Sequence, residues 1–437
     1  MFNILDVDTA RETILKRSPL STQPVPDGVR QGVEEIFGKG VTPAQAVARI
    51  LASVEKDGDR ALQKWSRILD GSQRARFLIP PAKLEAAYQR LEADLQGALE
   101  NAAERIRNFH RRQPLPDWET DELGGTLGQR VTPVSSAGVY VPGGTAPLPS
   151  SLLMSVIPAQ VAGVKRIVVA TPPDPHPSIL AAAALCGVEE VYEIGGAQAI
   201  AALAFGTESV PRVDVIAGAG NLFVTLAKQQ VYGLVGLDGL AGPTETMVIA
   251  DENADPAWVT ADLLAQAEHD VLASAILLTP SRPLARAVQA EIGRQLEDLS
   301  RAEIIAQSLD KKGGAVITPD LDTAAALADA YAAEHLCLAV ENPAGLAEKI
   351  NNAGGFFLGD HSFEVLGDYV AGPSHIMPTG GTARFASPLN VMNFVKISSV
   401  VGLDRETAAA LSPAAARIAR EETLTAHAAS ADFRSLS

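Results

Sequence analysis

The run Ile167-Val-Val-Ala-Thr171 is short and apolar, and it stops at Pro172-Pro173. Its length and its β-branched residues predict a buried strand. The residues on either side predict an alternation of helices and strands: helix 150–163, helix 178–187, strand 190–194, helix 197–204, strand 213–217 and helix 221–233. Pro158 should kink or divide the first of these helices. Strands that alternate with helices at this interval indicate βαβ units and a parallel sheet.

A second alternating run follows and predicts another α/β unit. Its expected elements are strand 246–250, helix 255–268, strand 274–279, helix 282–299, strand 315–318, helix 321–333, strand 336–340, helix 343–351 and strand 355–358. Residues 1–130 have mainly helical periodicity, with 118–129 as a charged connection. The segment 367–387 is long for an irregular connection, which suggests a functional loop.

The composition predicts a protein with more than one core. A chain of 437 residues exceeds the usual size of a single compact core, and 47% hydrophobic with 20% charged residues is typical of a globular protein. The formal net charge of −16 argues against nucleic acid as a partner, because phosphate binding needs clustered Lys and Arg.

Cys186 and Cys337 lie in apolar surroundings, so we expect two buried core residues and no disulfide framework. The acidic N-terminus does not resemble a signal peptide, and no stretch is apolar for long enough to predict a membrane span. We therefore expect a cytoplasmic protein that binds neither membrane nor nucleic acid.

Histidine is scarce, at seven residues, and four of them lie beside carboxylates or amides in the second half of the chain. Gln266 and His269 are three residues apart in a predicted helix, a spacing that puts both on one face, within reach of one ion. A solvated pair on a helix surface explains the same spacing.

Glu334-His335 stands where a helix gives way to the apolar run Leu336-Cys-Leu-Ala-Val340. Strand ends of parallel sheets are where α/β proteins place reactive groups, and two adjacent titratable groups can act as base and acid. A His that ends a helix and favours its dipole is the alternative.

Asp368 and His375 bracket a polar loop, and both residue types are common metal ligands. A polar turn in which Asp368 bonds local amides explains the first of them equally well. His427 follows Glu422 in the C-terminal tail, where a solvated helix residue is the alternative.

Three glycine clusters adjoin strands and precede helices: Gly143-Gly144, Gly195-Gly196 and Gly218-Ala-Gly220. This arrangement suits phosphate approach to the backbone. None reads Gly-x-Gly-x-x-Gly with an acidic residue about 20 positions later, so tight turns are an equal explanation.

Taken together, the segments resemble histidinol dehydrogenases from about Gln129 to His427. The matching stretches include Val139-Tyr-Val-Pro-Gly-Gly144, Pro149-Ser-Ser-Leu-Leu-Met154, the run from Gly195 to Pro211, Leu263-Leu-Ala-Gln-Ala-Glu-His-Asp270, Glu334-His335, Gly367-Asp-Tyr369, His375-Ile-Met-Pro378 and Leu424-Thr-Ala-His427. Such a long ordered series is specific.

The resemblance implies a role for each candidate residue. One zinc ion per subunit would be held by Gln266, His269, Asp368 and His427, and Glu334 and His335 would be the catalytic acid–base pair. Substrate contacts would come from Thr244, Gln266, His269, His335, Asp368, His375, Glu422 and His427. NAD contacts would fall on Tyr140, Gln198 and Asn221.

The implied fold has two incomplete Rossmann-like parallel-sheet domains with helical segments at both ends, in an intertwined homodimer with shared active sites. The expected parts are a helical segment 1–20, a larger α/β domain of 21–139 with 244–388, an NAD-binding domain 140–243 and a helical dimerisation tail 389–437. Residues 408–431 lack a wide apolar stripe, which fits a tail that needs a partner subunit.

The implied reaction is the oxidation of L-histidinol through L-histidinaldehyde to L-histidine with two NAD, the final steps of histidine biosynthesis. The sequence departs from the family at Thr244, where Ser is common, and at Ala219, where Pro is common. The extra methyl of Thr244 leaves open a dehydrogenase on the same scaffold that oxidises another alcohol. A zinc-stabilised binding protein without catalysis is a second alternative, but a structural zinc site has no use for an acid–base pair.

Overall fold

The structure is a computed structural model that describes residues 2–17, 25–143 and 146–435. Gly144 and the outermost residues of the expected N-terminal and C-terminal segments lie outside these ranges. The chain divides into two compact units, residues 1–112 with 135–393 and residues 113–134 with 394–437. No helix of the described residues is long and apolar enough to cross a membrane.

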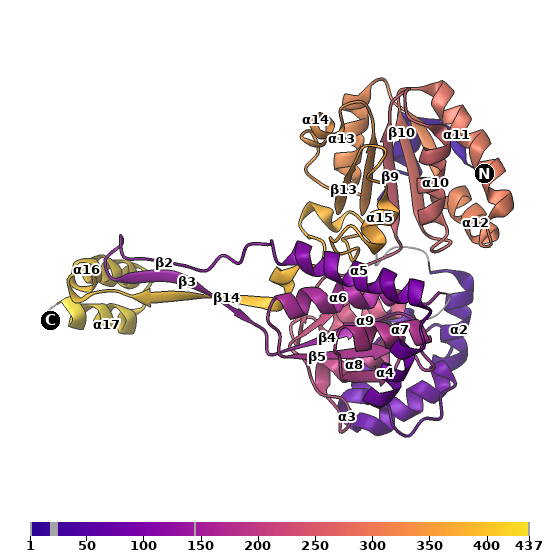
Figure 1. The fold of residues 1–437 in the computed structure, drawn as a ribbon. Helices are drawn as coiled ribbons and strands as arrows, with labels where there is room; N and C mark the ends of the chain where they lie inside the picture. The colour runs from indigo at the N-terminus through magenta and orange to yellow at the C-terminus, as the bar shows by residue number, and fades with distance from the viewer. Residues whose placement is uncertain (1, 18–24, 144–145, 436–437) are drawn as a thin grey trace. The chain divides into compact units, whose positions relative to one another are not determined.

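The first unit contains a six-stranded parallel sheet (Figure 1). Its strands, in spatial order, are β1 (Asn3–Asp6), β11 (Gly314–Ile317), β10 (Ser274–Thr279), β9 (Glu245–Ala250), β12 (His335–Ala339) and β13 (Gly355–Leu358). One face is covered by α10 (Pro256–Ala267), α11 (Arg282–Gln295) and α12 (Ala302–Lys312), and the other by α1 (Val7–Glu12), α13 (Leu321–Tyr331) and α14 (Pro343–Ala347). Helices on both faces bury the strands, which explains their continuous apolar sequence.

A five-stranded parallel sheet forms the rest of the first unit. Its order is β6 (Glu190–Glu193), β5 (Arg166–Thr171), β4 (Ser136–Tyr140), β7 (Val215–Ala217) and β8 (Gly236–Leu237). The helices packed on it are α3 (Pro43–Asp70), α8 (Gly196–Phe205) and α9 (Leu222–Val231) on one face and α4 (Pro81–Gln89), α5 (Ala93–His110), α6 (Pro149–Val161) and α7 (Pro177–Leu185) on the other.

The two sheets share one topology. In chain order the strands β4 to β8 are arranged 3-2-1-4-5, and so are β9 to β13, with β1 added beyond β11. Strand order therefore reverses between β4 and β7 in one sheet and between β9 and β12 in the other. Such switch points open crevices for ligands in α/β proteins, and the two predicted α/β runs are confirmed.

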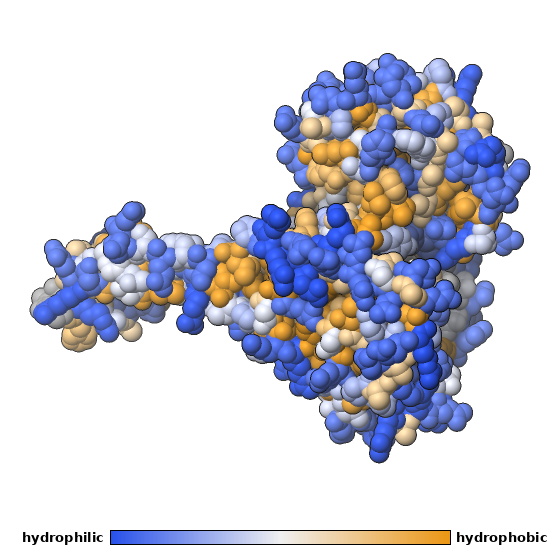
Figure 2. Space-filling view, in the orientation of Figure 1, coloured by the Kyte–Doolittle hydropathy of each residue, from blue (hydrophilic) through white to orange (hydrophobic). Residues whose placement is uncertain are grey.

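The second unit is built on an antiparallel sheet of β14 (Val395–Gly402), β3 (Thr126–Pro133) and β2 (Trp118–Thr120). Two helices follow β14 along the chain, α16 (Arg405–Glu421) and α17 (Thr425–Ser435). Figure 2 shows hydrophobic residues, in orange, at the surface of both units.

Several expectations about secondary structure were wrong. Residues 118–129 are not a connection, and 395–402 are a strand rather than part of a helical tail, because β3 and β14 pair along eight residues. Val395, Ile397, Val400 and Val401 favour a strand, a β-branched signal that outweighs the Ala-rich sequence around them.

The boundaries of the parts also differ from expectation. Residues 25–112 pack mainly on the five-stranded sheet, where α3 and α4 contact α8 and α7, and not on the larger sheet. Residues 113–134 pair with the C-terminal segment, and β1 adds an unexpected strand before α1. Helix α2 (Asp27–Phe37), the short α15 (Glu364–Tyr369) and the 3₁₀ turns at Leu296–Asp298, Thr382–Arg384 and Val391–Phe394 complete the described elements.

Pro158 was expected to kink or divide α6, and the helix is not divided there. Proline has no N–H, so the carbonyl of Met154, four residues earlier, loses its helical partner. The hydroxyl of Ser374 donates to that carbonyl at 3.2 Å. The helix therefore continues, and its freed carbonyl fastens the loop that carries His375.

Candidate active site

The predicted catalytic pair lies at the amino end of the six-stranded sheet. His335 opens β12 and is paired in register with Thr246 of the neighbouring strand β9. Glu334 directly precedes His335, and Thr244 directly precedes β9. We expected reactive groups at a strand end, and the end used is opposite to the carboxyl ends where open α/β sheets usually bind ligands.

Five other predicted residues line one cavity of about 150 Å³ together with this pair. The set that lines the cavity comprises Thr244, Gln266, His269, Glu334, His335, Asp368 and His375. They come from the starts of β9 and β12, the end of α10, helix α15 and the loop after it. The structure therefore brings these scattered residues together at one cavity, and their convergence on one metal ion stays a prediction.

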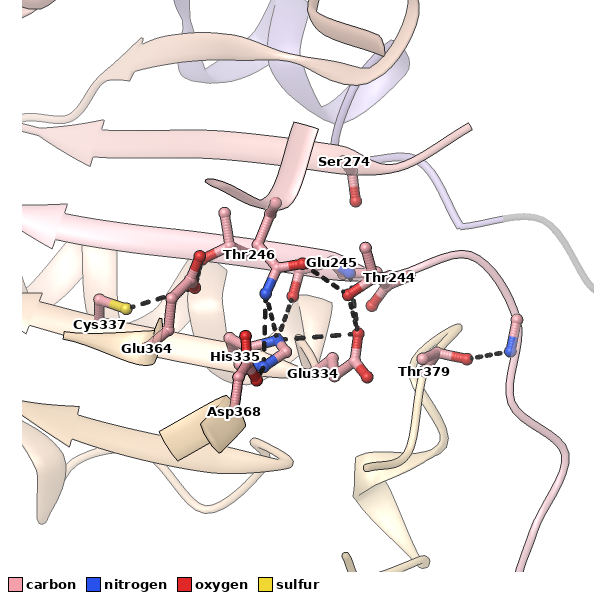
Figure 3. A network of polar contacts seen from close by, with 12 residues as sticks. Thr244, Glu245, Thr246, Ser274, Glu334, His335, Cys337, Glu364, Asp368 and Thr379 are labelled. Carbon is pink, nitrogen blue, oxygen red and sulfur yellow. Dashed lines mark hydrogen bonds and ion pairs between the residues drawn. The ribbon is translucent and has the colours of Figure 1, made fainter. Parts of the chain in front are cut away.

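Glu334 is 7% exposed and is held by two short contacts (Figure 3). Its Oε2 lies 2.6 Å from the Thr244 hydroxyl and accepts from the Glu245 N–H at 3.0 Å. Burial raises the pKa of Glu334 to about 7.

The Thr244 hydroxyl also lies 2.8 Å from Oε1 of Gln266, so it faces two acceptors with one proton. A proton on Glu334 satisfies all three groups, because the carboxylic acid then donates to Thr244 and Thr244 donates to Gln266. The geometry and the raised pKa thus agree that Glu334 can change protonation near neutral pH.

His335 is 2% exposed, and both of its ring nitrogens face acceptors. Nδ1 lies 3.2 Å from the carbonyl of Glu245, and Nε2 lies 3.2 Å from Oδ1 of Asp368. The ring stacks on Phe357 with 5.7 Å between centroids. Burial alone would favour the neutral imidazole, but the Asp368 hydrogen bond and the nearby carboxylates raise the pKa of His335 to about 10.

The other two imidazoles in the cavity are biased toward the neutral form. Burial lowers the pKa of His375, whose Nδ1–H donates to the Asp368 carbonyl at 2.8 Å and whose Nε2 accepts from Ser151 at 3.1 Å. Desolvation by the surrounding protein also lowers the pKa of His269, although this side chain keeps contact with solvent.

Asp368 is the acidic residue that contacts both His335 and His375 in this cavity. Burial acts to raise its pKa, but the hydrogen bond and positive charge of His335 outweigh burial and hold it below the usual range. A neutral His269, an ionised Asp368 and the amide oxygen of Gln266 all line this cavity, in the states that ligands of a divalent metal require.

The donor set therefore fits zinc in its chemistry, although only part of the predicted set is in this cavity. In the portion of the chain that the structure covers, no group of three or more His, Cys, Asp or Glu side chains is arranged to hold a metal ion. Of the four predicted zinc ligands, Gln266 offers an amide and His427 belongs to the second unit. The two predicted ligands of the His or Asp type in this cavity are therefore His269 and Asp368.

Glu422 and His427 both belong to the second unit. Glu422 directly follows α16 at its C-cap position, His427 lies in the first turn of α17, and both side chains are exposed in the single chain.

The three predicted cofactor residues line a second cavity, of about 390 Å³, on the five-stranded sheet. Tyr140 ends β4, Gln198 lies in the first turn of α8 after β6, and Asn221 precedes α9 after β7. All three stand at the carboxyl end of the sheet, next to the β4–β7 switch point where dinucleotides bind in this class of fold.

Polar contacts organise this cavity. The Gly196 N–H donates to the Tyr140 hydroxyl at 3.1 Å, and the Gln198 amide donates to Oδ2 of Asp70 at 2.9 Å. Oε1 of Gln198 is buried without a protein partner, and no side chain caps the start of α8. The uncapped N-terminus of α8 presents backbone N–H donors and fits a phosphate-containing ligand. Oε1 of Gln198 is an acceptor and suits a hydrogen-bond donor of a ligand instead.

Sequence reasoning missed several residues of both cavities. Ser151 bonds His375, and Asp70, whose pKa burial raises to about 6, bonds Gln198 across 128 positions. No local pattern marks either residue. The turn 218–221 connects the cavities, since Ala219 lines the first and Asn221 the second.

Comparisons with known proteins identify the family of this chain. The family model described as Histidinol dehydrogenase matches residues 39–435. The chain is 51% identical to a histidinol dehydrogenase of Deinococcus radiodurans over 94% of this chain and 95% of that protein. It is 52% identical to one from Thermus thermophilus over 90% and 95%.

A crystal structure of histidinol dehydrogenase from Elizabethkingia anophelis superposes with a TM-score of 0.90 at 32% identity. The match covers 99% of this chain and 98% of that one. Family model, sequence relatives and solved structure coincide over almost the whole chain. The chain therefore belongs to the histidinol dehydrogenase family of NAD-dependent oxidoreductases.

Proposed function

We propose that the chain oxidises L-histidinol through L-histidinaldehyde to L-histidine, the last steps of histidine biosynthesis, with two NAD and one zinc ion per subunit. The observation that carries the proposal is the buried Glu334-His335 pair, which shares one cavity with Gln266, His269 and Asp368. Bound zinc would position the amino alcohol, and NAD would take a hydride in each oxidation.

His335 is the proposed base for the substrate hydroxyl. Its hydrogen bond to the Glu245 carbonyl fixes the ring, while Nε2 points to the Asp368 side of the cavity. A base must be neutral, and Asp368 is a main cause of the raised pKa of His335. Charge compensation of Asp368 by a bound cation would bring that pKa down toward the working range.

Glu334 is the proposed group that activates water for hydration of the aldehyde. A carboxyl with a pKa of about 7 can both accept and return a proton at neutral pH. The Thr244 hydroxyl and the Glu245 N–H orient it, so the carboxyl is aimed before substrate arrives.

The remaining assignments follow from the family and from the two cavities. His375, Thr244 and Glu422 would contact substrate, and the cavity with Tyr140, Gln198 and Asn221 would bind NAD. Glu422 and His427 would come from a partner in a homodimer with shared sites, a role consistent with their exposure. Exposed Leu411, Ile418 and Phe433 on α16 and α17 support a partner surface.

We place the reaction in the cytoplasm. Cys186 and Cys337 are free and buried, which suits a reducing compartment.

The yield of NADH tests the reaction directly. We expect two NADH for each L-histidinol consumed by the zinc-loaded chain, because both oxidations occur at one site. Absorbance at the NADH band, with product analysis, gives the ratio. A yield of one would leave only an alcohol dehydrogenase, and NADH from another amino alcohol but not from L-histidinol would favour the alternative substrate suggested by Thr244.

Substitutions in the pair should separate the two oxidations. His335→Asn should lose about 10²-fold or more of kcat from either L-histidinol or the aldehyde, yet still bind zinc and L-histidinol. Glu334→Gln keeps the shape and should impair aldehyde oxidation more than alcohol oxidation. Steady-state assays started from each substrate measure the difference. Near-normal kcat in His335→Asn would remove the assigned base.

Mixed dimers test the shared site. His427→Ala should weaken zinc retention, and co-expression with His335→Asn should recover about one quarter of wild-type activity, because half of the dimers regain one complete site. A matched mixture of His427→Ala with Glu422→Ala should recover none, since both changes lie in the contributed segment. Equal activity of the two mixtures would argue against a site completed by the partner.

A further inference from the structure

Arg17 lies near the end of the first described stretch of the chain, after β1 and α1, and its guanidinium reaches the amino end of the six-stranded sheet. It forms a two-pronged ion pair with Glu245, with one contact, from Nη2 to Oε2, at 2.8 Å. The two side chains are 21% and 9% exposed. This pair spans 228 positions and does not belong to the predicted site.

The same guanidinium also binds the turn that leads to the catalytic pair. Its Nε and Nη2 donate to the Tyr331 carbonyl at 2.9 and 2.7 Å, and Nη2 lies 3.3 Å from the Ala332 carbonyl. The charge sits 3.5 Å over the Tyr331 ring. These carbonyls end α13, where a cation is favoured by the helix dipole.

The backbone of that turn needs support. Ala332 has φ of +53° and ψ of +62°, a left-handed conformation that is unfavourable for a residue other than glycine. Glu334 and His335 follow directly. Arg17 therefore stabilises the carbonyls of a strained turn two residues before the catalytic carboxyl.

Glu245 links Arg17 to the same pair from the other strand. Its N–H donates to Oε2 of Glu334 at 3.0 Å, and its carbonyl is 3.2 Å from Nδ1 of His335. Its carboxylate also accepts the Gly380 N–H at 3.1 Å, in the loop after His375.

We propose that Arg17 is a positioning residue for the reaction: by joining Glu245 to the end of α13, it fixes the geometry of Glu334 and His335 without touching substrate. This inference rests on the proposed function of that pair. A misplacement on the order of 1 Å in such a pair can reduce turnover about 10²-fold.

The test compares Arg17→Ala and Arg17→Lys with Arg11→Ala, a matched control whose exposed side chain lies on α1 in the same segment. We expect kcat with L-histidinol to fall about 100-fold in Arg17→Ala and less in Arg17→Lys. KM for NAD should stay within about twofold, because the proposed cofactor cavity is on the other sheet. Millimolar guanidinium ion should restore part of kcat in Arg17→Ala only.

Hydrogen–deuterium exchange supplies a readout that does not need turnover. Amides of 331–336 and 244–246 should exchange faster in Arg17→Ala than in the wild type, while those of β4 and β5 should not change. If Arg17→Ala does not fold, the same measurements of kcat and amide exchange are made on Arg17→Lys and Glu245→Gln.

Normal kcat in folded Arg17→Ala would overturn the role of Arg17. So would a loss that guanidinium does not restore and that is accompanied by faster exchange throughout the sheets. A wild-type chain that does not oxidise L-histidinol would instead refute the proposed function, and the wild-type assay alone distinguishes the two failures.

Discussion

The parallel pairing of β9 with β12 is the constraint on which the candidate site depends. Because His335 is in register with Thr246, the backbone of Glu245 faces both members of the proposed catalytic pair, Glu334 and His335. One peptide segment thus donates to the carboxyl and accepts from the imidazole. Strand pairing is stiff and buried, so it can hold two titratable groups in place at little further entropic cost.

Around this frame the protein balances charge among side chains that are mostly buried. Glu334 and Asp368 are acids in opposite states, since burial raises the pKa of the first and His335 lowers that of the second. Asp368 is hydrogen-bonded to the His335 imidazole at 3.2 Å and also lies near His375 and His269, whose charges act in the same direction on its pKa. Pairs of groups whose pKa values are driven apart are suited to acid–base work.

The sequence was sufficient to predict the alternating strands and helices, because continuous apolar runs and helical periodicity are local signals. It was not sufficient for β14, whose pairing with β3 depends on residues more than 200 positions away, or for the continuity of α6 at Pro158. Ser374 donates to the carbonyl that the proline frees, and no local pattern contains that partner. The ion pair of Arg17 with Glu245 could not be predicted either, because its two residues are 228 positions apart in the sequence.

The candidate residues came from the resemblance to a family, and their grouping around one cavity is a physical result. Seven of them line it, from elements between β9 and the loop after α15. The order of helix, Glu334-His335 and apolar run already placed the pair at the amino end of a strand, although open α/β sheets usually bind ligands at the carboxyl end. Helix α10 and helix α15 bring Gln266 and Asp368 to the amino end.

The central claim is that the amino ends of β9 and β12 hold a metal-assisted oxidation site. Anomalous diffraction at the zinc edge, from crystals of the zinc-loaded protein, tests this claim most directly. The account predicts a strong peak within ligand distance of His269 and Asp368, with Gln266 beside it. A fully occupied zinc ion bound elsewhere, with these side chains free of metal, would contradict it.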